Sequence, residues 1–475
     1  MYPEILSGKA MLSDLILTHF MRARANSILR FGSRGSADPA EAPIPQPDHR
    51  YLLYLHVPFC EQLCPYCSFN RVRLDRSLAE RYFQALEREI HAYHGRGYRF
   101  DSIYVGGGTP TVLPQRLNSI LRLAGRLWPI ERISVETNPN HLRPEILQPL
   151  KNLGVKRLSV GVQSFQDSIL KAIGRYRAYG SGNRIARQLE DARGIFDTLN
   201  VDMIFNFPMQ DEHMLDRDLD ILEQLDSDQI TFYPLMAARQ VRRELAAARS
   251  AAPDRERRFY NKIWDRMSGR YRPSSAWCFS RKNDGEQYGT REMPASASEQ
   301  ARGNRSKHLI DEYIAASEEY AGLGSGSFGY LDGRIYANTF SIPRYIESLD
   351  GGRLPLLASH RFTTSEQIRY DFLMKTFGGR LDLERLSRKY GFSARRKLWK
   401  ELLFLRAAGA LRGIRARPGT DPGHGEVVEL NRKGYYLLVV LMREFFTGVN
   451  NFREACLAEI ASADPEGEYS PVQPV

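Results

Sequence analysis

Cysteine is scarce in this sequence of 475 residues: there are five, and three of them lie in one short segment. Five cysteines in so long a chain cannot form a disulfide framework, and nothing at the N-terminus has the pattern of a secretory signal peptide. Long apolar runs are also missing, since none approaches the roughly 18 residues of a membrane-spanning helix. With 42% hydrophobic and 26% charged residues, we expect a reduced, cytoplasmic, globular protein of two or three domains.

Acidic residues are also fewer than basic residues in this chain. Lys and Arg total 67 against 56 Asp and Glu, which gives a formal net charge of +11. Such an excess favours anionic partners, namely nucleic acid, acidic lipid headgroups or a carboxylate-rich small molecule. The charge by itself does not choose among these classes.

The clustered cysteines are Cys60, Cys64 and Cys67, in the segment HVPFCEQLCPYCSFN. A structural zinc site needs four ligands, usually as two separated pairs, and Cys278 and Cys456 each stand alone. Three cysteines can instead hold three irons of a [4Fe–4S] cluster and leave the fourth iron open to a substrate or cofactor. The alternative is chance clustering on a loop, and the neighbouring motifs decide between the two.

Short apolar segments alternate with helical patterns through the first half of the chain. Helices are predicted at 77–94, 115–127, 144–153, 166–174 and 215–225, each between two strand-like runs. The strand-like runs are LLYLHVPF, FDSIYVGGGTPT, RISVETNP, RLSVGVQSF, VDMIFNFP and QITFYPLM. Six such strands predict an α/β fold with a parallel sheet, curved into a (β/α)6 partial barrel. Each motif then falls at the C-terminal end of a strand, where parallel α/β folds place their chemistry.

Together these motifs resemble the radical S-adenosylmethionine (SAM) superfamily, whose cluster motif is C-x3-C-x2-C with an aromatic residue, here Tyr66, before the last cysteine. More narrowly, YLHVPFC, YVGGGTPT, VETNP, GVQSF and VDMIFNFP are similar to the oxygen-independent coproporphyrinogen III oxidase family and its relatives. The match is close over residues 51–236 and continues in GLGSGSFGYLDGRIYAN and a C-terminal domain. The motifs occur in the family's order at comparable spacings.

The resemblance implies a [4Fe–4S] cluster on the three cysteines that binds SAM and splits it to a 5′-deoxyadenosyl radical. It also implies a second SAM nearby, an anionic tetrapyrrole substrate, and an electron donor such as flavodoxin or ferredoxin. By motif position, Tyr54, Glu136 and Phe328 would contact the cluster-bound SAM. The residues implied for the remaining cofactor contacts are Tyr66, Gly107, Gly108, Thr109, Gln163, Arg175 and Asp202.

Physical arguments support several of these assignments. Three glycines at 106–108 would let backbone N–H groups approach a methionyl carboxylate or amine, although a tight turn after a strand explains them too. Glu136, at a strand end, can pair with an amino group or ribose hydroxyls. Arg175 offers a fork suited to a carboxylate, but the sequence leaves open whether Arg175 or Arg177 turns inward. His56 either orders the cluster loop and bonds a sulfur, or is a satisfied strand-end histidine.

The family contains several functions, and the sequence leaves the choice open. In the oxidases a further cysteine follows the cluster motif after one residue, whereas this chain has Ser68 and Phe69 there, as in the haem-chaperone and methyltransferase branches. The histidine-bearing segment of the chaperones is absent, because residues 271–283 read YRPSSAWCFSRKN. The first 50 residues do not resemble the oxidase's substrate-binding segment. We expect a coproporphyrinogen-oxidase-like oxidoreductase, with a radical methyltransferase or a haem chaperone as alternatives.

Cys278 and Cys456 lie outside the cluster motif. A thiol at Cys278 could donate a hydrogen atom or anchor a methyl carrier, but free cysteines are usually small buried hydrophobes, and we favour the structural role. Cys456 falls in a helical pattern and is expected to be structural.

The remaining sequence predicts an N-terminal helix and linker at 1–50, the barrel at 51–236, its completion with a variable loop region at 237–360, and a C-terminal domain at 361–475. The N-terminal helix, with Arg22 and Arg24, would either cover the barrel mouth or make weak contact with an anionic membrane. Residues 284–307 have the composition of a mobile loop. Three helices and a short hairpin within 362–446 resemble a winged helix, which raises nucleic-acid binding as a hypothesis from another class; we expect none.

Overall fold

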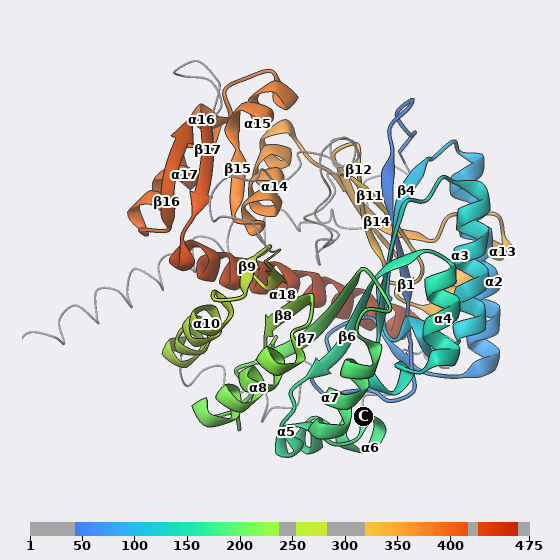
Figure 1. Cartoon of the computed structure of the whole chain (residues 1–475). Helices are drawn as coiled ribbons and strands as arrows, with labels where there is room; N and C mark the ends of the chain where they lie inside the picture. Colours follow the sequence, from blue (N-terminus) through green and yellow to red (C-terminus); the bar gives the residue numbers. More distant parts are fainter. Residues whose placement is uncertain (1–42, 237–252, 283–318, 417–425, 464–475) are drawn as a thin grey trace, which may run out of the picture.

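The structure is a computed structural model that describes residues 43–236, 253–282, 319–416 and 426–463. Within this part of the chain, twelve strands form one mixed sheet (Figure 1). Its centre is six neighbouring parallel strands in chain order, each overlapping one of the predicted runs; three of them begin one to three residues earlier than predicted. They are β1 (Tyr51–Val57), β4 (Phe100–Gly107), β5 (Arg132–Thr137), β6 (Val155–Gln163), β7 (Thr198–Phe205) and β8 (Gln229–Pro234).

The central strands are apolar along their whole length because both faces of the sheet are covered. Every residue of β1 and of β4 is buried, which is the pattern expected of parallel strands between helices and a filled interior. The crossover helices lie along the outer side of the sheet in Figure 1. They are α2 (Arg76–Gly95), α3 (Pro114–Leu127), α4 (Pro144–Asn152), α5 (Asp167–Ala172), α6 (Tyr176–Tyr179), α7 (Gly182–Ala192) and α8 (Glu212–Leu225), with short 3-10 turns η1 (Pro110–Val112) and η2 (Pro139–His141).

The five predicted helices are all present, but the sequence reading missed α6 and α7. Both are short, and α7 has the polar sequence GNRIARQLEDA. Too few apolar residues are present there to show the periodicity of a helix. Ser181 caps α7 by accepting a hydrogen bond from the amide of Arg184. The predicted N-terminal helix and the loop at 284–307 lie outside the described residues.

The sheet extends beyond the six predicted strands on both sides. Next to β1, parallel β11 (Tyr320–Leu323) leads into antiparallel β12 (Phe328–Leu331), β13 (Arg334–Asn338) and β14 (Leu356–Arg361). Beyond β8 lie β10 (Cys278–Arg281) and β9 (Tyr271–Pro273), preceded by α10 (Pro253–Met267). A tight turn joins β12 to β13, with Asp332 and Gly333 both at positive φ, 47° and 67°. Because β14 and β9 end the strand order without pairing to each other, the sheet stays open.

The C-terminal region forms a second, smaller body. Its three strands make an antiparallel sheet in the order β15 (Arg380–Asp382), β17 (Glu426–Leu430), β16 (Leu411–Ala416). Its helices are α14 (Thr364–Phe377), α15 (Leu383–Tyr390), α16 (Ala394–Lys397) and α17 (Trp399–Ala407), whereas α13 (Ile342–Asp350), which precedes β14, packs against α2 of the barrel. The interpretation as a winged helix stays a prediction.

The last described helix, α18 (Arg432–Ala463), leaves this small sheet and runs back across the barrel strands (Figure 1). Arg443 of α18 forms an ion pair with Glu256 of α10, and the ring of Phe446 lies 5.7 Å from that of Trp277. α18 therefore covers the barrel with residues far along the chain. None of the helices in the described ranges has the length and apolarity to cross a membrane.

Candidate active site

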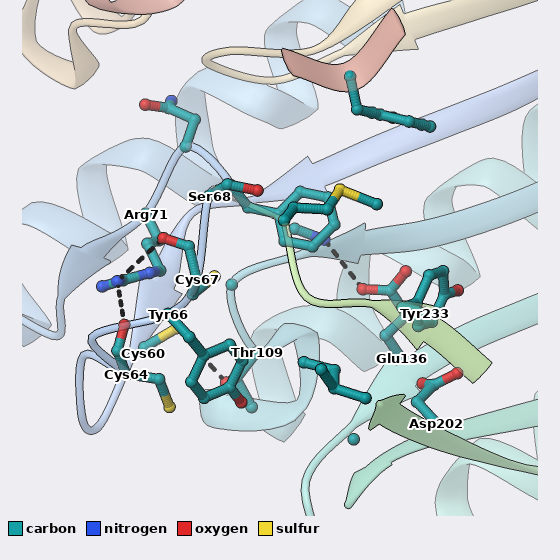
Figure 2. A pocket seen from close by; sticks show the side chains of 18 of the residues that line it. Cys60, Cys64, Tyr66, Cys67, Ser68, Arg71, Thr109, Glu136, Asp202 and Tyr233 are labelled. Carbon is teal, nitrogen blue, oxygen red and sulfur yellow. Dashed lines mark hydrogen bonds between the residues drawn. The ribbon is translucent and has the colours of Figure 1, made fainter. Parts of the chain in front are cut away.

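The three clustered cysteines lie on one loop at the end of the first strand. Cys60 ends the two-residue strand β2 (Phe59–Cys60), which pairs with β3 (Val72–Arg73), and Cys64 and Cys67 follow in the loop between them. Arg71 holds this loop from inside, since its Nη2 donates to the carbonyl oxygens of Cys64 and Cys67. Figure 2 shows the three cysteines gathered at one end of a cavity, away from Glu136 and Asp202.

The thiols are shielded from water and lie near one another. Cys60 and Cys64 are buried and Cys67 is half-buried. Burial, reinforced by Cys67, raises the pKa of the Cys60 thiol to about 12, although a hydrogen bond from Thr109 opposes the shift. Such thiols ionise only when a metal centre supplies positive charge. The donor set thus suits a metal group that replaces the thiol protons.

The arrangement fits a cluster rather than a single ion. Across the described residues, no group of three or more His, Cys, Asp or Glu side chains is placed to hold one metal ion. A four-iron cluster takes one thiolate at each of three irons, so its three cysteines surround it instead of converging on a point. The residues present therefore fit a [4Fe–4S] cluster with one iron left for another ligand.

The glycines after β4 allow the chain to pass closely by the cluster loop. A Cβ on Gly107 would lie 2.8 Å from the His56 ring, and one on Gly108 would lie 2.7 Å from the Phe59 carbonyl oxygen and 3.0 Å from Cys60 Sγ. The expected contact of their N–H groups with SAM stays a prediction, and within the protein two of these amides have partners of their own. The Gly107 amide donates to Glu136 at 3.2 Å and the Gly108 amide to the Val57 carbonyl at 2.7 Å. Their main contribution is close packing.

Glu136 occupies the end of β5, as predicted, and faces the cavity. Its carboxylate accepts hydrogen bonds from the Tyr104 hydroxyl at 2.9 Å and from the Gly107 amide. Asp202 lies within β7, two strands away in the sheet, and its carboxylate accepts hydrogen bonds from Ser159 Oγ at 2.8 Å and Asn200 Nδ2 at 2.7 Å. These hydrogen bonds, all from neutral donors, fix the positions of both carboxylates at the cavity.

Arg175 turns inward and Arg177 is exposed, which settles the choice between them. The buried Arg175 guanidinium donates to Tyr66 Oη at 3.2 Å, to Asn138 Oδ1 at 2.9 Å and to the Gly161 carbonyl, and its Nη1 lies 3.5 Å from Cys64 Sγ. Its Nε has no partner within the described residues. Arg175 therefore joins the cysteine loop to the ends of β5 and β6, with one donor to spare.

His56 orders the cluster loop. Its Nε2 is 2.8 Å from the Asn70 carbonyl oxygen and its Nδ1 is 2.9 Å from the Tyr54 hydroxyl. Burial lowers the pKa of His56 to about 4, so the ring is neutral near pH 7. Since both ring nitrogens are engaged, this histidine fixes the exit of the loop and has no free donor for a cluster sulfur.

One cavity of about 260 Å³ brings together every residue that the sequence singled out for cofactor binding. Gln163 enters it from the end of β6 with a positive φ of 78°, an unusual conformation for a non-glycine residue and common at functional sites. The thirteen predicted residues in the lining are Tyr54, Cys60, Cys64, Tyr66, Cys67, Gly107, Gly108, Thr109, Glu136, Gln163, Arg175, Asp202 and Phe328. Their individual roles stay predictions.

The sequence reading missed the residues that cover the cavity. They come from β8, the residue before β10, the segment after β13, and α18, and carry no motif. The aromatic and polar ones among them are Tyr233, Trp277, Phe340, Phe446, Asn450 and Arg453. The rings of Phe328 and Phe340 lie 6.0 Å apart, and those of Tyr233 and Trp277 5.1 Å apart. A helical period predicts that a face of α18 is buried, but not against which part of the barrel.

Cys278 does not join the site. It pairs with Thr231 in the sheet and is fully buried, and only its neighbour Trp277 lines the cavity. The structural reading of this thiol is therefore the better one. Cys456 lies on α18 and is also outside the cavity lining.

The chain matches known proteins in sequence and in fold. Residues 54–222 match the radical SAM superfamily. The heme chaperone HemW of Bacillus subtilis (strain 168) is 29% identical over 355 residues, covering 72% of this chain and 87% of the relative. The oxygen-independent coproporphyrinogen III oxidase of Cereibacter sphaeroides is 27% identical over 362 residues, covering 72% of this chain and 76% of the relative.

Among solved structures, the radical SAM coproporphyrinogen III oxidase HemN of Escherichia coli superposes with a TM-score of 0.65 at 22% identity, over 83% of this chain and 90% of that one. This likeness confirms the α/β fold. The family implies a [4Fe–4S] cluster and S-adenosylmethionine as cofactors. The chain therefore carries a radical SAM domain, and its relatives include HemW heme chaperones and oxygen-independent coproporphyrinogen III oxidases.

Proposed function

We propose that this protein is a radical SAM oxidoreductase that acts on a tetrapyrrole bearing carboxylate side chains, in the manner of coproporphyrinogen oxidation. The single observation that carries the proposal is the shared cavity. It joins three thiols on one loop, the polar strand ends of the barrel, and an aromatic cover. When bound there, the cluster and SAM supply a 5′-deoxyadenosyl radical that abstracts hydrogen.

The protein's own residues divide the cavity into three parts. Cys60, Cys64 and Cys67 hold the cluster, and Arg71 fixes the loop that carries them. In the proposal Tyr54, Glu136 and Phe328 contact the cluster-bound SAM. The second SAM is contacted by Tyr66, Gly108, Thr109, Gln163, Arg175 and Asp202, with Gly107 packed beside them. The aromatic cover faces the substrate.

The cover also keeps water and small reductants away from the reacting atoms. α18 brings Phe446 and Val449 to the cavity, and Trp277, the residue before β10, also lines it. Apolar side chains at this position exclude water without competing for the polar groups of SAM. A substrate therefore enters before the cover is fully packed, or displaces part of it. The electron comes from a carrier such as flavodoxin or ferredoxin, which makes the reduced cytoplasm the setting of the proposal.

One observation separates an enzyme from a heme-binding chaperone at this cavity. A chaperone that holds heme through its iron needs an axial ligand, and histidine is a common one. Among the described residues, His56 is the one histidine in the cavity lining, and both its ring nitrogens are engaged. This favours a ligand that is held by its carboxylates and its flat face. The chaperone and the radical methyltransferase remain the second candidates, and nucleic-acid binding the remote one.

The test starts with the cluster. Protein reconstituted without oxygen should hold four irons per chain, and replacing Cys60, Cys64 and Cys67 together by alanine should remove them. Cys278→Ala is the matched control, because this buried thiol lies outside the cavity, and it should keep its iron. A full cluster in the triple variant, or zinc alone in the wild-type protein, would refute the assignment.

The second stage identifies the reaction. Reduced protein with SAM should release 5′-deoxyadenosine, faster with coproporphyrinogen than without, together with carbon dioxide from the substrate. S-adenosylhomocysteine among the products would move the assignment to a methyltransferase. Stoichiometric heme binding without any 5′-deoxyadenosine would move it to a chaperone. Tight DNA binding with a steep salt dependence would favour the nucleic-acid hypothesis.

A further inference from the structure

We propose that Arg453 of α18 binds a carboxylate of the substrate, and so acts as a specificity-determining residue on the cover of the cavity. The inference deepens the proposed function and rests on it. The sequence assigns Arg22 and Arg24 to a helix that is expected to cover the barrel mouth, where they could contact an anionic substrate, and both lie outside the described residues. Arg453 was not among its candidates.

The Arg453 side chain is buried at the cavity wall. It is 3% exposed and lines the cavity together with Asn450, one turn earlier on α18. Nη1 donates to the carbonyl oxygen of Ser68, directly after the last cysteine of the loop. Nε and Nη2 have no hydrogen-bond partner within the described residues. A buried guanidinium with two free donor nitrogens is costly unless a ligand satisfies it.

The charges around Arg453 call for an anion. Burial lowers the pKa of its guanidinium, the charge of Arg71 lowers it further, and Cys67 and Glu454 oppose the shift. The Nη2 of Arg71 donates to two carbonyl oxygens of the loop. Within the described residues, Arg453 makes one hydrogen bond, to the carbonyl oxygen of Ser68. Free Nε and Nη2 on one planar group form the fork that a carboxylate accepts in bidentate fashion.

The position of Arg453 points to the substrate rather than to SAM. Ser68, to which Arg453 donates, lies across the cavity from Glu136 and Asp202, two of the residues assigned to SAM (Figure 2). On the Arg453 side, Phe340 and Phe446 line the cavity, and the ring of Phe452, the residue before Arg453, lies 6.0 Å from that of Phe340. An aromatic wall next to a free guanidinium suits a flat, apolar molecule with carboxylates at its edge.

The experiment compares two probes that differ only in charge. Coproporphyrin III, a stable oxidised stand-in with four free carboxylates, and its tetramethyl ester are titrated anaerobically into the full-length reconstituted protein, and binding is followed by quenching of tryptophan fluorescence. Arg453→Gln should weaken binding of the free acid at least about tenfold and leave binding of the ester unchanged. Arg453→Lys should restore part of the affinity, because it keeps the charge and loses the fork.

Arg432→Gln is the matched control, since Arg432 lies on the same helix, is exposed and pairs with Asp265 outside the cavity. This variant should bind both probes like the wild-type protein. Iron content, the cluster EPR signal and SAM cleavage without substrate should be unchanged in Arg432→Gln, and all three are recorded for the Arg453 variants.

Four outcomes would overturn the proposal. An equal loss of affinity for acid and ester in Arg453→Gln would mean that Arg453 only packs the cover. A changed EPR signal or cluster potential with unchanged acid binding would mean that its free nitrogens serve the cluster. If wild-type protein binds neither probe, the tetrapyrrole assignment itself fails and this inference falls with it. If wild-type and Arg453→Gln bind the acid equally, the inference fails alone.

Discussion

The rim of the cavity and its cover are built by opposite means. The rim consists of strand ends within residues 51–236, where polar side chains are held by many mutual hydrogen bonds, as Arg175 is by Tyr66 and Asn138. The cover consists of residues from β8, from the segments before β10 and after β13, and from α18, where aromatic rings dominate and Arg453 keeps free donors. A preorganised rim suits cofactors that are the same in every turnover. A cover whose Arg453 donors lack partners within the protein suits a substrate that enters and leaves. This comparison makes four predictions.

The largest effect is expected where the rim is packed most tightly. Gly108→Ala would put a Cβ 2.7 Å from the Phe59 carbonyl oxygen, in the backbone of the cluster loop. Because backbone cannot yield as a side chain does, we expect the loop to shift and little or no cluster to assemble, measured as iron and sulfide per chain. Gly125→Ala is the control: with nothing within 4 Å of its Cβ, it should keep the cluster and add about 0.5–1 kcal/mol of stability. Normal iron content in Gly108→Ala would contradict the prediction.

The second prediction concerns the removal of one cation, Arg175, from the rim. Arg175→Gln removes a buried guanidinium that joins Tyr66, Asn138 and the end of β6. Hydrogen bonds to charged groups contribute about 1.5–3 kcal/mol, so one SAM should bind about 10- to 100-fold more weakly. In anaerobic equilibrium dialysis, the stoichiometry should fall from two SAM per chain toward one. The exposed Arg177→Gln should bind as the wild-type protein does, and two SAM retained by Arg175→Gln would argue against the assignment.

The third prediction loosens the cover without touching the rim. Glu256 of α10 and Arg443 of α18 form a buried ion pair, to which Tyr436 also donates at 3.3 Å. Arg443→Met leaves the Glu256 carboxylate buried with weaker partners, and removing one member of such a pair costs about 3–5 kcal/mol. We expect a lower melting temperature and weaker porphyrin binding with normal iron content.

The double variant Glu256→Gln with Arg443→Met should recover much of that stability, because no buried charge then lacks its partner. Arg432→Gln breaks an exposed pair on the same helix and should change the melting temperature little. Loss of the cluster in Arg443→Met would show that rim and cover are not separable.

The smallest expected effect is on the pH dependence of folding stability, through the buried Glu89 and its contacts next to β11, in β13 and in α13. Glu89 of α2 is fully buried and accepts hydrogen bonds from the Gly324 amide, Asn338 Nδ2 and the Tyr345 hydroxyl. Burial raises its pKa from 4.5 to about 7. Between these values the unfolded chain has released the proton and the folded protein keeps it, so stability should fall as pH rises, on the order of 2 kcal/mol.

Urea unfolding of wild-type protein and of Glu89→Gln, at about pH 5 and about pH 7.5, measures this slope. The variant should be the less pH-dependent of the two, because its buried amide does not titrate. An unchanged slope would mean that Glu89 does not control it.

The local chain was sufficient to predict the rim. C-x3-C-x2-C, the glycines at 106–108 and polar residues at apolar strand ends are patterns within a few residues, and parallel strands bring their C-terminal ends to one edge. Their convergence in one cavity therefore followed from the α/β alternation. The hydrogen-bond partners of the glycine amides could not be predicted in this way, because they are Glu136 and Val57 in other segments.

Only the tertiary structure decided the cover. Nothing local to Arg453 distinguishes it from the other arginines of this basic chain, and its role depends on Ser68, 385 residues earlier. Likewise, the choice of Arg175 over Arg177 depends on Tyr66 and on the end of β6, and the separation of Cys278 from the cavity depends on which face of β10 turns inward. Sequence patterns record the period of an element and the chemistry of its residues, whereas the pairing of distant surfaces is set by packing that no short segment contains.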